Sequence, residues 1–208
     1  MDAVDVFALA RRGSAAEVLE RLSAQPELLS AREPGNQATL LHIFARLSDA
    51  AAVSRLLELG AEAEARDVNF CTALHVAARA DATPERGSGE QSAAAAPGGD
   101  QRAAAIESTL RALLSAGRAR VTARDHFGLT ALHHAAQAGN TETVGFLLGL
   151  NTSLSMPRAP LEADTNAEDR PLHLAAAGGH AGTVRRLPCS IAQGEGVTCP
   201  APSPKGRA

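Results

Sequence analysis

Histidine is the residue type in this chain best suited to metal binding or acid–base chemistry. The 208 residues include seven histidines, and an imidazole ring can ligate a metal ion or exchange a proton near neutral pH. Four of them recur in one short pattern, as Thr39–His42, Thr72–His75, Thr130–His133 and Arg170–His173, which read TLLH, TALH, TALH and RPLH. Because one periodic position explains all four, we interpret these histidines as structural.

The cysteines and the other reactive side chains form no catalytic or metal-binding motif. Cys71 stands alone, and Cys189 and Cys199 flank a Gly-rich stretch, where a redox pair is conceivable but unpaired thiols are the favoured interpretation. A zinc site would need more ligands than that pair supplies. No phosphate-binding G-x-x-x-x-G-K-[ST] motif and no Ser/His/Asp or Cys/His set stands out. We therefore expect no enzyme activity, no cofactor and no metal.

The composition indicates closely packed thin helices. Hydrophobic residues make up 45% of the chain but aromatic residues only 2%, so the apolar content is mostly Ala and Leu. A β-sandwich or barrel would need more aromatic and β-branched residues. The formal net charge of −3 argues against a nucleic-acid binder that relies on a large basic patch.

Sorting signals are not evident in the sequence. The first residues carry two acids and no basic segment, unlike a signal peptide. No apolar run of about 20 residues predicts a membrane span. With few cysteines, these features favour a reducing compartment, and we expect a cytoplasmic or nuclear protein without a membrane partner.

The elements that position the four patterned histidines repeat with a fixed period. His42 and His75 are 33 residues apart, and the later spacings of 58 and 40 equal 33 plus inserts of 25 and 7. A 33-residue unit built on T-x-L-H followed by small residues resembles the ankyrin repeat. This resemblance implies an all-α solenoid of stacked helix pairs with short β-hairpin fingers. It also places His180 on the family's Gly-His turn.

Each residue of the repeated pattern has a physical role. Thr is a good helix N-cap, Leu fills the core between units, and His can bridge backbone groups within and between units through its two ring nitrogens. The adjacent His133 and His134 cannot face the same ligand. We number as two to five the units that contain His42, His75, His133 and His173. The family's finger glycine is kept only at Gly128, in unit four, and is replaced at Gln37, Phe70 and Glu168, so the finger shape of units two, three and five stays open.

The repeat register divides the chain into segments. We predict an atypical N-terminal capping helix pair at 1–33, ankyrin repeats at 34–187, a disordered insert at about 81–103, a short insert at about 151–164, and a disordered non-repeat tail at 188–208. Pro188 stands where the last helix needs a second Leu. We interpret the tail as foreign to the repeat, through truncation or alternative splicing of a longer ankyrin protein, and expect self-association through the uncapped last unit.

The resemblance implies that another protein docks on the finger tips and on the exposed face of the first helices. The positions that the family leaves variable and exposed there are Val68, Asn69, Cys71, Arg79, His126, Phe127, Leu129, Gln137 and Ala138. Phe127 and Phe70 are either exposed anchors for a partner or pack against neighbouring fingers. We expect an interaction module that acts as an adaptor or scaffold. A transcription-factor regulator of the ankyrin inhibitor type, or a targeting fragment of a larger enzyme, are the alternatives.

Overall fold

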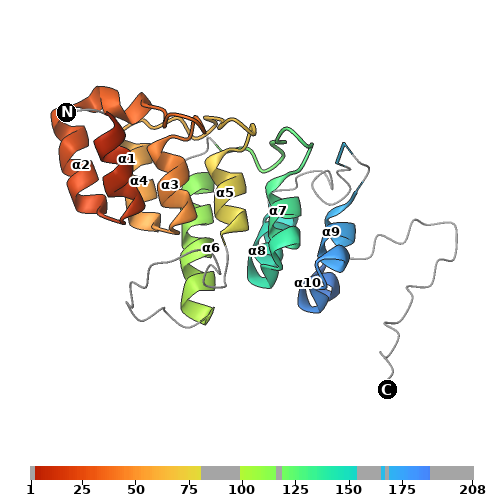
Figure 1. Cartoon of the computed structure of the whole chain (residues 1–208). Helices are drawn as coiled ribbons and strands as arrows, with labels where there is room; N and C mark the ends of the chain where they lie inside the picture. Colours follow the sequence, from red (N-terminus) through yellow and green to blue (C-terminus); the bar gives the residue numbers. More distant parts are fainter. Residues whose placement is uncertain (1–2, 81–98, 116–118, 154–164, 167–168, 188–208) are drawn as a thin grey trace, which may run out of the picture.

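The computed structural model of the chain shows helix pairs stacked side by side in a row (Figure 1). It describes residues 3–80, 99–115, 119–153, 165–166 and 169–187. In these segments all regular secondary structure is helical and no β-strand is assigned. The predicted all-α repeat fold is confirmed.

The helices form two layers. The first helix of each pair lies in one layer, which runs α1 (Ala3–Arg11), α3 (Leu40–Arg46), α5 (Ala73–Arg79), α7 (Ala131–Ala138) and α9 (Pro171–Ala177). The second helices lie in the other, which runs α2 (Ala15–Ala24), α4 (Ala50–Glu58), α6 (Gly99–Ser115), α8 (Thr141–Ser153) and α10 (Ala181–Arg186), with a 3-10 turn at Pro26–Ser30. Each helix packs on the helices that precede and follow it in its own layer.

The repeated Thr and His start the first helices by capping them. The Thr39 hydroxyl accepts from the backbone of α3, and the Thr39 backbone N–H donates to His42 Nδ1 at 3.2 Å. His42 Nε2 lies 3.0 Å from the backbone oxygen of Cys71 in the next unit. The same cap recurs at Thr72 with His75 and at Thr130 with His133. The predicted bridging within and between units is therefore observed for His42 and His75.

Small side chains let the first helices approach one another closely. Ala77, Ala78, Ala135 and Ala136 are completely buried between neighbouring units. The pattern Leu is also buried, as at Leu74 with 1% of its surface exposed. Burying one such Leu contributes about 1.5–3 kcal/mol, so the repeated pattern accounts for much of the core.

Asn140 holds the end of α5, from which the chain leaves toward the predicted insert. Gly139 ends α7 in a left-handed conformation at φ 74°, and the buried Asn140 follows it. Its amide donates to the backbone oxygens of Ala78 and Ala80 at 3.0 and 2.9 Å. A residue of unit four thus satisfies two carbonyls at the end of α5, and α5 still packs on α6.

Two helices extend into segments that the sequence assigns to inserts. Helix α6 begins at Gly99 and α8 runs to Ser153, so 99–103 and 151–153 belong to helices and those insert boundaries are wrong. For α6 the physical reason is local, because Gln101, Arg102 and the alanines after them are strong helix formers. Residues 81–98, 154–164 and 188–208 lie outside the described segments, and their predicted disorder stays a prediction.

The fingers between units are tight turns joined to one another by single backbone hydrogen bonds. Val68 N donates to Asn36 O at 2.9 Å, and His126 N donates to Asn69 O at 3.0 Å. The finger position that has Gly128 at φ 77° has Gln37 at φ 58° and Phe70 at φ 62°. Units two and three therefore keep the finger conformation without the glycine. Glu168 lies outside the described residues.

Candidate functional site

A groove of about 470 Å³ lies between the fingers and the first helices of units three to five. Six of the nine residues predicted to contact a partner line it: Asn69, Cys71, Arg79, Phe127, Leu129 and Gln137. Of the other three, Val68 and His126 are exposed on the neighbouring turns and Ala138 is half-buried at the end of α7. The structure thus brings the predicted residues to one side of the stack.

The finger tips carry a row of exposed aromatic rings, which we call the aromatic row: Phe70, His126 and Phe127. The rings of Phe70 and His126 stack with centroids 6.1 Å apart. His126 meets Phe127 edge to face at 5.4 Å, and the Arg66 guanidinium lies over Phe70 at 5.8 Å. Phe127 is 60% exposed and Phe70 49% exposed, so these contacts, within and between fingers, leave much of each side chain open to solvent.

Phe70 has an unfavourable backbone conformation. Its φ of 62° lies in the left-handed region, where a non-glycine residue costs roughly 1–2 kcal/mol. The equivalent place in the next finger has Gly128. Residues held in such conformations cluster at functional sites, and here the strained residue presents an exposed ring.

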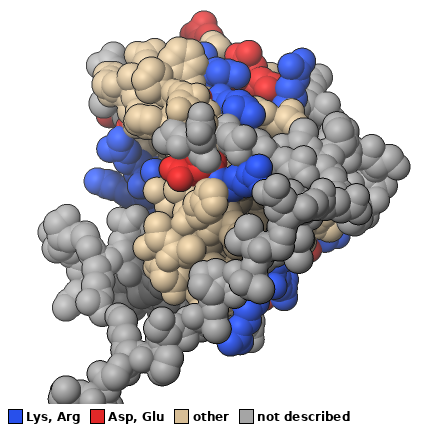
Figure 2. Space-filling view, turned by 90° about the vertical axis from the view of Figure 1, so that its right-hand side faces the viewer, with Lys and Arg blue, Asp and Glu red and all other residues tan. Residues whose placement is uncertain are grey.

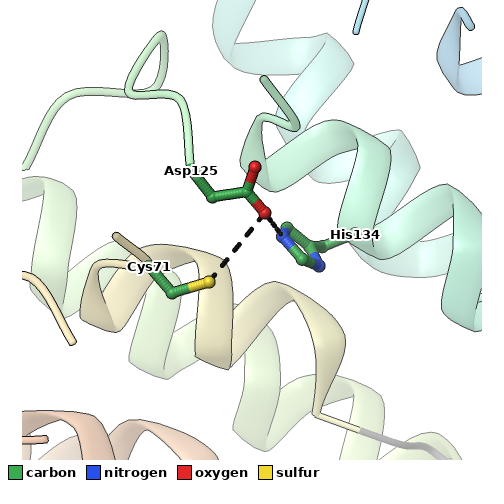
Figure 3. Close-up of side chains that lie close together, drawn as sticks. All are labelled: Cys71, Asp125 and His134. Atoms are coloured by element: carbon green, nitrogen blue, oxygen red, sulfur yellow. Dashed lines mark hydrogen bonds and ion pairs between the residues drawn. The ribbon is translucent and has the colours of Figure 1, made fainter. Parts of the chain in front are cut away.

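The floor of the groove holds a cluster of Cys71, Asp125 and His134, whose side chains point toward one another (Figure 3). His134 Nε2 donates to Asp125 Oδ2 at 2.9 Å. The Cys71 thiol faces the same oxygen at 4.0 Å. The other oxygen, Asp125 Oδ1, accepts from the backbone N–H groups of Phe127 and Leu129 at 2.9 and 2.8 Å and so shapes the finger.

The protonation states of this cluster argue against nucleophilic chemistry. Burial raises the pKa of Cys71 to about 12, and the Asp67 and Asp125 carboxylates act in the same direction. A thiol that stays protonated is a poor nucleophile. Burial lowers the pKa of His134 despite its hydrogen bond to Asp125, so the ring is neutral at pH 7. Its other nitrogen, Nδ1, is buried without a hydrogen-bond partner.

Asp125 and His134 are groove residues that the sequence did not predict. They are nine residues apart, and 54 residues separate Cys71 from Asp125, so no short motif joins them. The only signal in the sequence that could have found them is the repeat register, because stacking brings equivalent positions of successive units next to one another. His134 reaches the groove because the adjacent His133 turns inward to cap α7.

A family model described as ankyrin repeats, in three copies, matches residues 101–194. The matched segment contains α7 to α10 and nearly all of α6. Before it, α3 and α5 carry the same Thr and His caps and continue the same layer. No helix in the described segments is long and apolar enough to cross a membrane. The helix pairs, their caps and the family match agree with one another, and together they support an ankyrin-repeat protein.

Proposed function

We propose that this protein is a non-catalytic adaptor or scaffold that binds another protein through its finger tips and the adjoining groove. Ankyrin repeats in general mediate protein–protein interaction, which supports the class of function. The observation that carries the proposal is the exposure of large apolar side chains on adjacent fingers. Val68, Phe70 and Phe127 are 55%, 49% and 60% exposed.

Such side chains are suited to anchor a partner. Aromatic residues are enriched among those that dominate binding energy, and they act best beside a pocket that excludes water. Phe127 belongs both to the aromatic row and to the wall of the groove. A partner segment that covers the row would place its own side chains in the groove.

The groove adds polar groups that can orient the partner. Arg79 and Gln137 are exposed on α5 and α7, and Asp169 lies at the far end. A guanidinium can bind a carboxylate through two hydrogen bonds. Protein interfaces typically combine aromatic contacts with a limited number of direct hydrogen bonds, and this surface offers both kinds of group.

The test is to capture binding proteins with the full chain and with a tip variant that carries Val68→Ser and Phe127→Ser. Proteins recovered from cell extract are quantified by mass spectrometry. We expect the direct partner to be depleted with the tip variant. Once it is known, Phe127→Ala alone should weaken binding by roughly 1–4 kcal/mol.

A matched control carries Leu47→Ser and Leu59→Ser, which change two exposed leucines at the ends of α3 and α4. It should recover the same proteins as the unmodified chain. Thermal unfolding of each variant verifies that the fold survives. If both double variants deplete the same captured proteins to the same extent, the finger tips are not the binding surface.

A further inference from the structure

We propose that Cys71, Asp125 and His134 form a binding site for a zinc-type divalent cation in the floor of the groove. The three side chains come from two fingers and from α7, and their potential ligand atoms all lie within 4.8 Å of one another (Figure 3). This site goes beyond the proposed protein binding and stands on separate observations.

The donor set selects the class of metal. One thiolate sulfur, one imidazole nitrogen and one carboxylate oxygen are all ligands that Zn²⁺ accepts, whereas Ca²⁺ and Mg²⁺ need mostly oxygen. Three protein ligands leave a fourth tetrahedral position open. All three residues also line the groove, so water or a group from a bound molecule can complete the coordination.

The site is held in place by hydrogen bonds outside it. The Cys71 backbone N–H donates to Asp67 Oδ1 at 2.9 Å. Asp125 is fixed through Oδ1, which leaves Oδ2 facing His134 and Cys71. Asp125 and His134 are 8% and 6% exposed, so their side chains have little freedom. Because these ligand side chains are already fixed, they lose little further conformational entropy when a metal ion binds.

The geometry needs only a small adjustment to hold the ion. Ligand atoms around tetrahedral zinc are about 3.2–3.8 Å apart, given bond lengths of about 2.0–2.3 Å. The separation of His134 Nε2 from Asp125 Oδ2 is 2.9 Å and that of Cys71 Sγ from the same oxygen is 4.0 Å. Tetrahedral coordination therefore requires the first separation to widen and the second to shorten by a few tenths of an ångström.

Metal binding rearranges two protons. The Cys71 thiol proton leaves to solvent when the sulfur bonds to the ion, and the His134 ring proton moves from Nε2 to Nδ1. Because Nδ1 is buried without a partner, this second change weakens the site relative to a zinc finger. Without metal, Asp125 accepts the hydrogen bonds of both groups instead.

The experiment uses the full chain with Cys189→Ser and Cys199→Ser, which leaves Cys71 as its single thiol. Titration with Co²⁺ should produce one equivalent of thiolate-to-cobalt charge-transfer absorption, which Zn²⁺ then displaces. Zn²⁺ should also raise the melting temperature, because the ion binds the folded state. Absence of the thiolate band, or a dissociation constant of about 1 mM or weaker, would overturn the proposal.

Ligand variants in the same background assign the site. Cys71→Ser should remove the charge-transfer band, and His134→Gln should weaken Co²⁺ binding at least about tenfold. His126→Gln is the matched control, since it changes an exposed histidine outside the cluster, and should leave the titration unchanged. A band that persists with undiminished affinity in His134→Gln would also overturn the assignment. Circular dichroism confirms that each variant is folded.

Discussion

Phe70 combines an exposed aromatic ring with an unfavourable backbone conformation. Its ring is half-exposed and stacks on His126, while its backbone has the left-handed conformation that Gly128 adopts in the next finger. An apolar ring in solvent and a strained backbone both oppose folding. The finger turn requires the backbone conformation, which Gln37 also adopts, whereas burial of the ring by a partner would offset the cost of its exposure.

Two substitutions at Phe70 separate the effect of the exposed ring on stability from the effect of the strained backbone. Phe70→Ala removes the ring but keeps a Cβ at positive φ, and Phe70→Gly removes both. We expect the Gly variant to be more stable than the Ala variant by about 1 kcal/mol, the opposite of their order in a helix. Urea unfolding measures the difference. An Ala variant as stable as the Gly variant would show that the strain is absent.

At the scale of the element, the histidine caps of α3 and α5 make these two helices sensitive to acid. His75 is 1% exposed, its Nδ1 accepts from the backbone of Thr72, and its Nε2 lies 3.0 Å from the backbone oxygen of Ala123. Protonation would destroy the acceptor and place a charge in the core. Burial, with a smaller effect from His134, accordingly lowers the pKa of His75 to about 4.

The lowered pKa of His75 determines how the stability of the folded chain depends on pH. The unfolded chain binds a proton at His75 near pH 6.5 and the folded chain near pH 4, so stability is complete above about pH 6.5 and declines toward pH 4. His75 alone accounts for about 3 kcal/mol of this decline. The pKa values of His42 and His134 are lowered too and act in the same direction.

Urea unfolding between pH 7.5 and 4.5 tests this prediction. His75→Gln should be less stable at pH 7.5 but lose less stability on acidification. A variant with the same pH dependence as the unmodified chain would exclude His75 as the titrating group.

Asn140 joins two units through one side chain. Asn140→Ala leaves the backbone oxygens of Ala78 and Ala80 without their donor, which should cost about 1–3 kcal/mol for each acceptor that stays buried. Amide hydrogen exchange should show faster opening of α5 than of α3. Thr141→Ala, one residue further on, is the control and should leave exchange in α5 unaltered.

The sequence predicts the helices of the repeats better than it predicts the ends of the inserts or the side chains that meet in the groove. The Thr and His pattern locates each first helix because a cap has a fixed spacing in the chain. The ends of the inserts are missed because Gly, Ser and Ala indicate a loop by composition, while the alanines near 103–105 continue a helix. The Cys71, Asp125 and His134 cluster is missed because only stacking brings those residues together, across 54 positions.

At the scale of the whole molecule, unit five lies at the end of the described stack, and within the described residues no further repeat packs on its outer side. Figure 2 views this end, where uncharged areas alternate with charged side chains. His173 has 60% of its side chain exposed, in contrast to the fully buried His133 of unit four. A repeat held from one side is less stable than one held from both.

Unit five should therefore open first. We expect amide hydrogen exchange in residues 172–187 well before 130–148, and self-association of the isolated chain in sedimentation experiments, because an uncovered apolar face promotes it. Addition of a designed capping repeat after Leu187 is the control and should slow the exchange of α9 and α10. Equal protection of both segments in a strictly monomeric chain would contradict the prediction.

The closure of α5 by Asn140 has a consequence for how such a protein can evolve. The end of that helix is secured from the following unit, and doubling the length of the chain between Ala80 and α6 costs only about 0.6 kcal/mol of closure entropy. New sequence can accumulate there while the repeats on either side keep their pairing. The same junction offers an engineer a place to graft a reporter domain close to Arg79 and the groove.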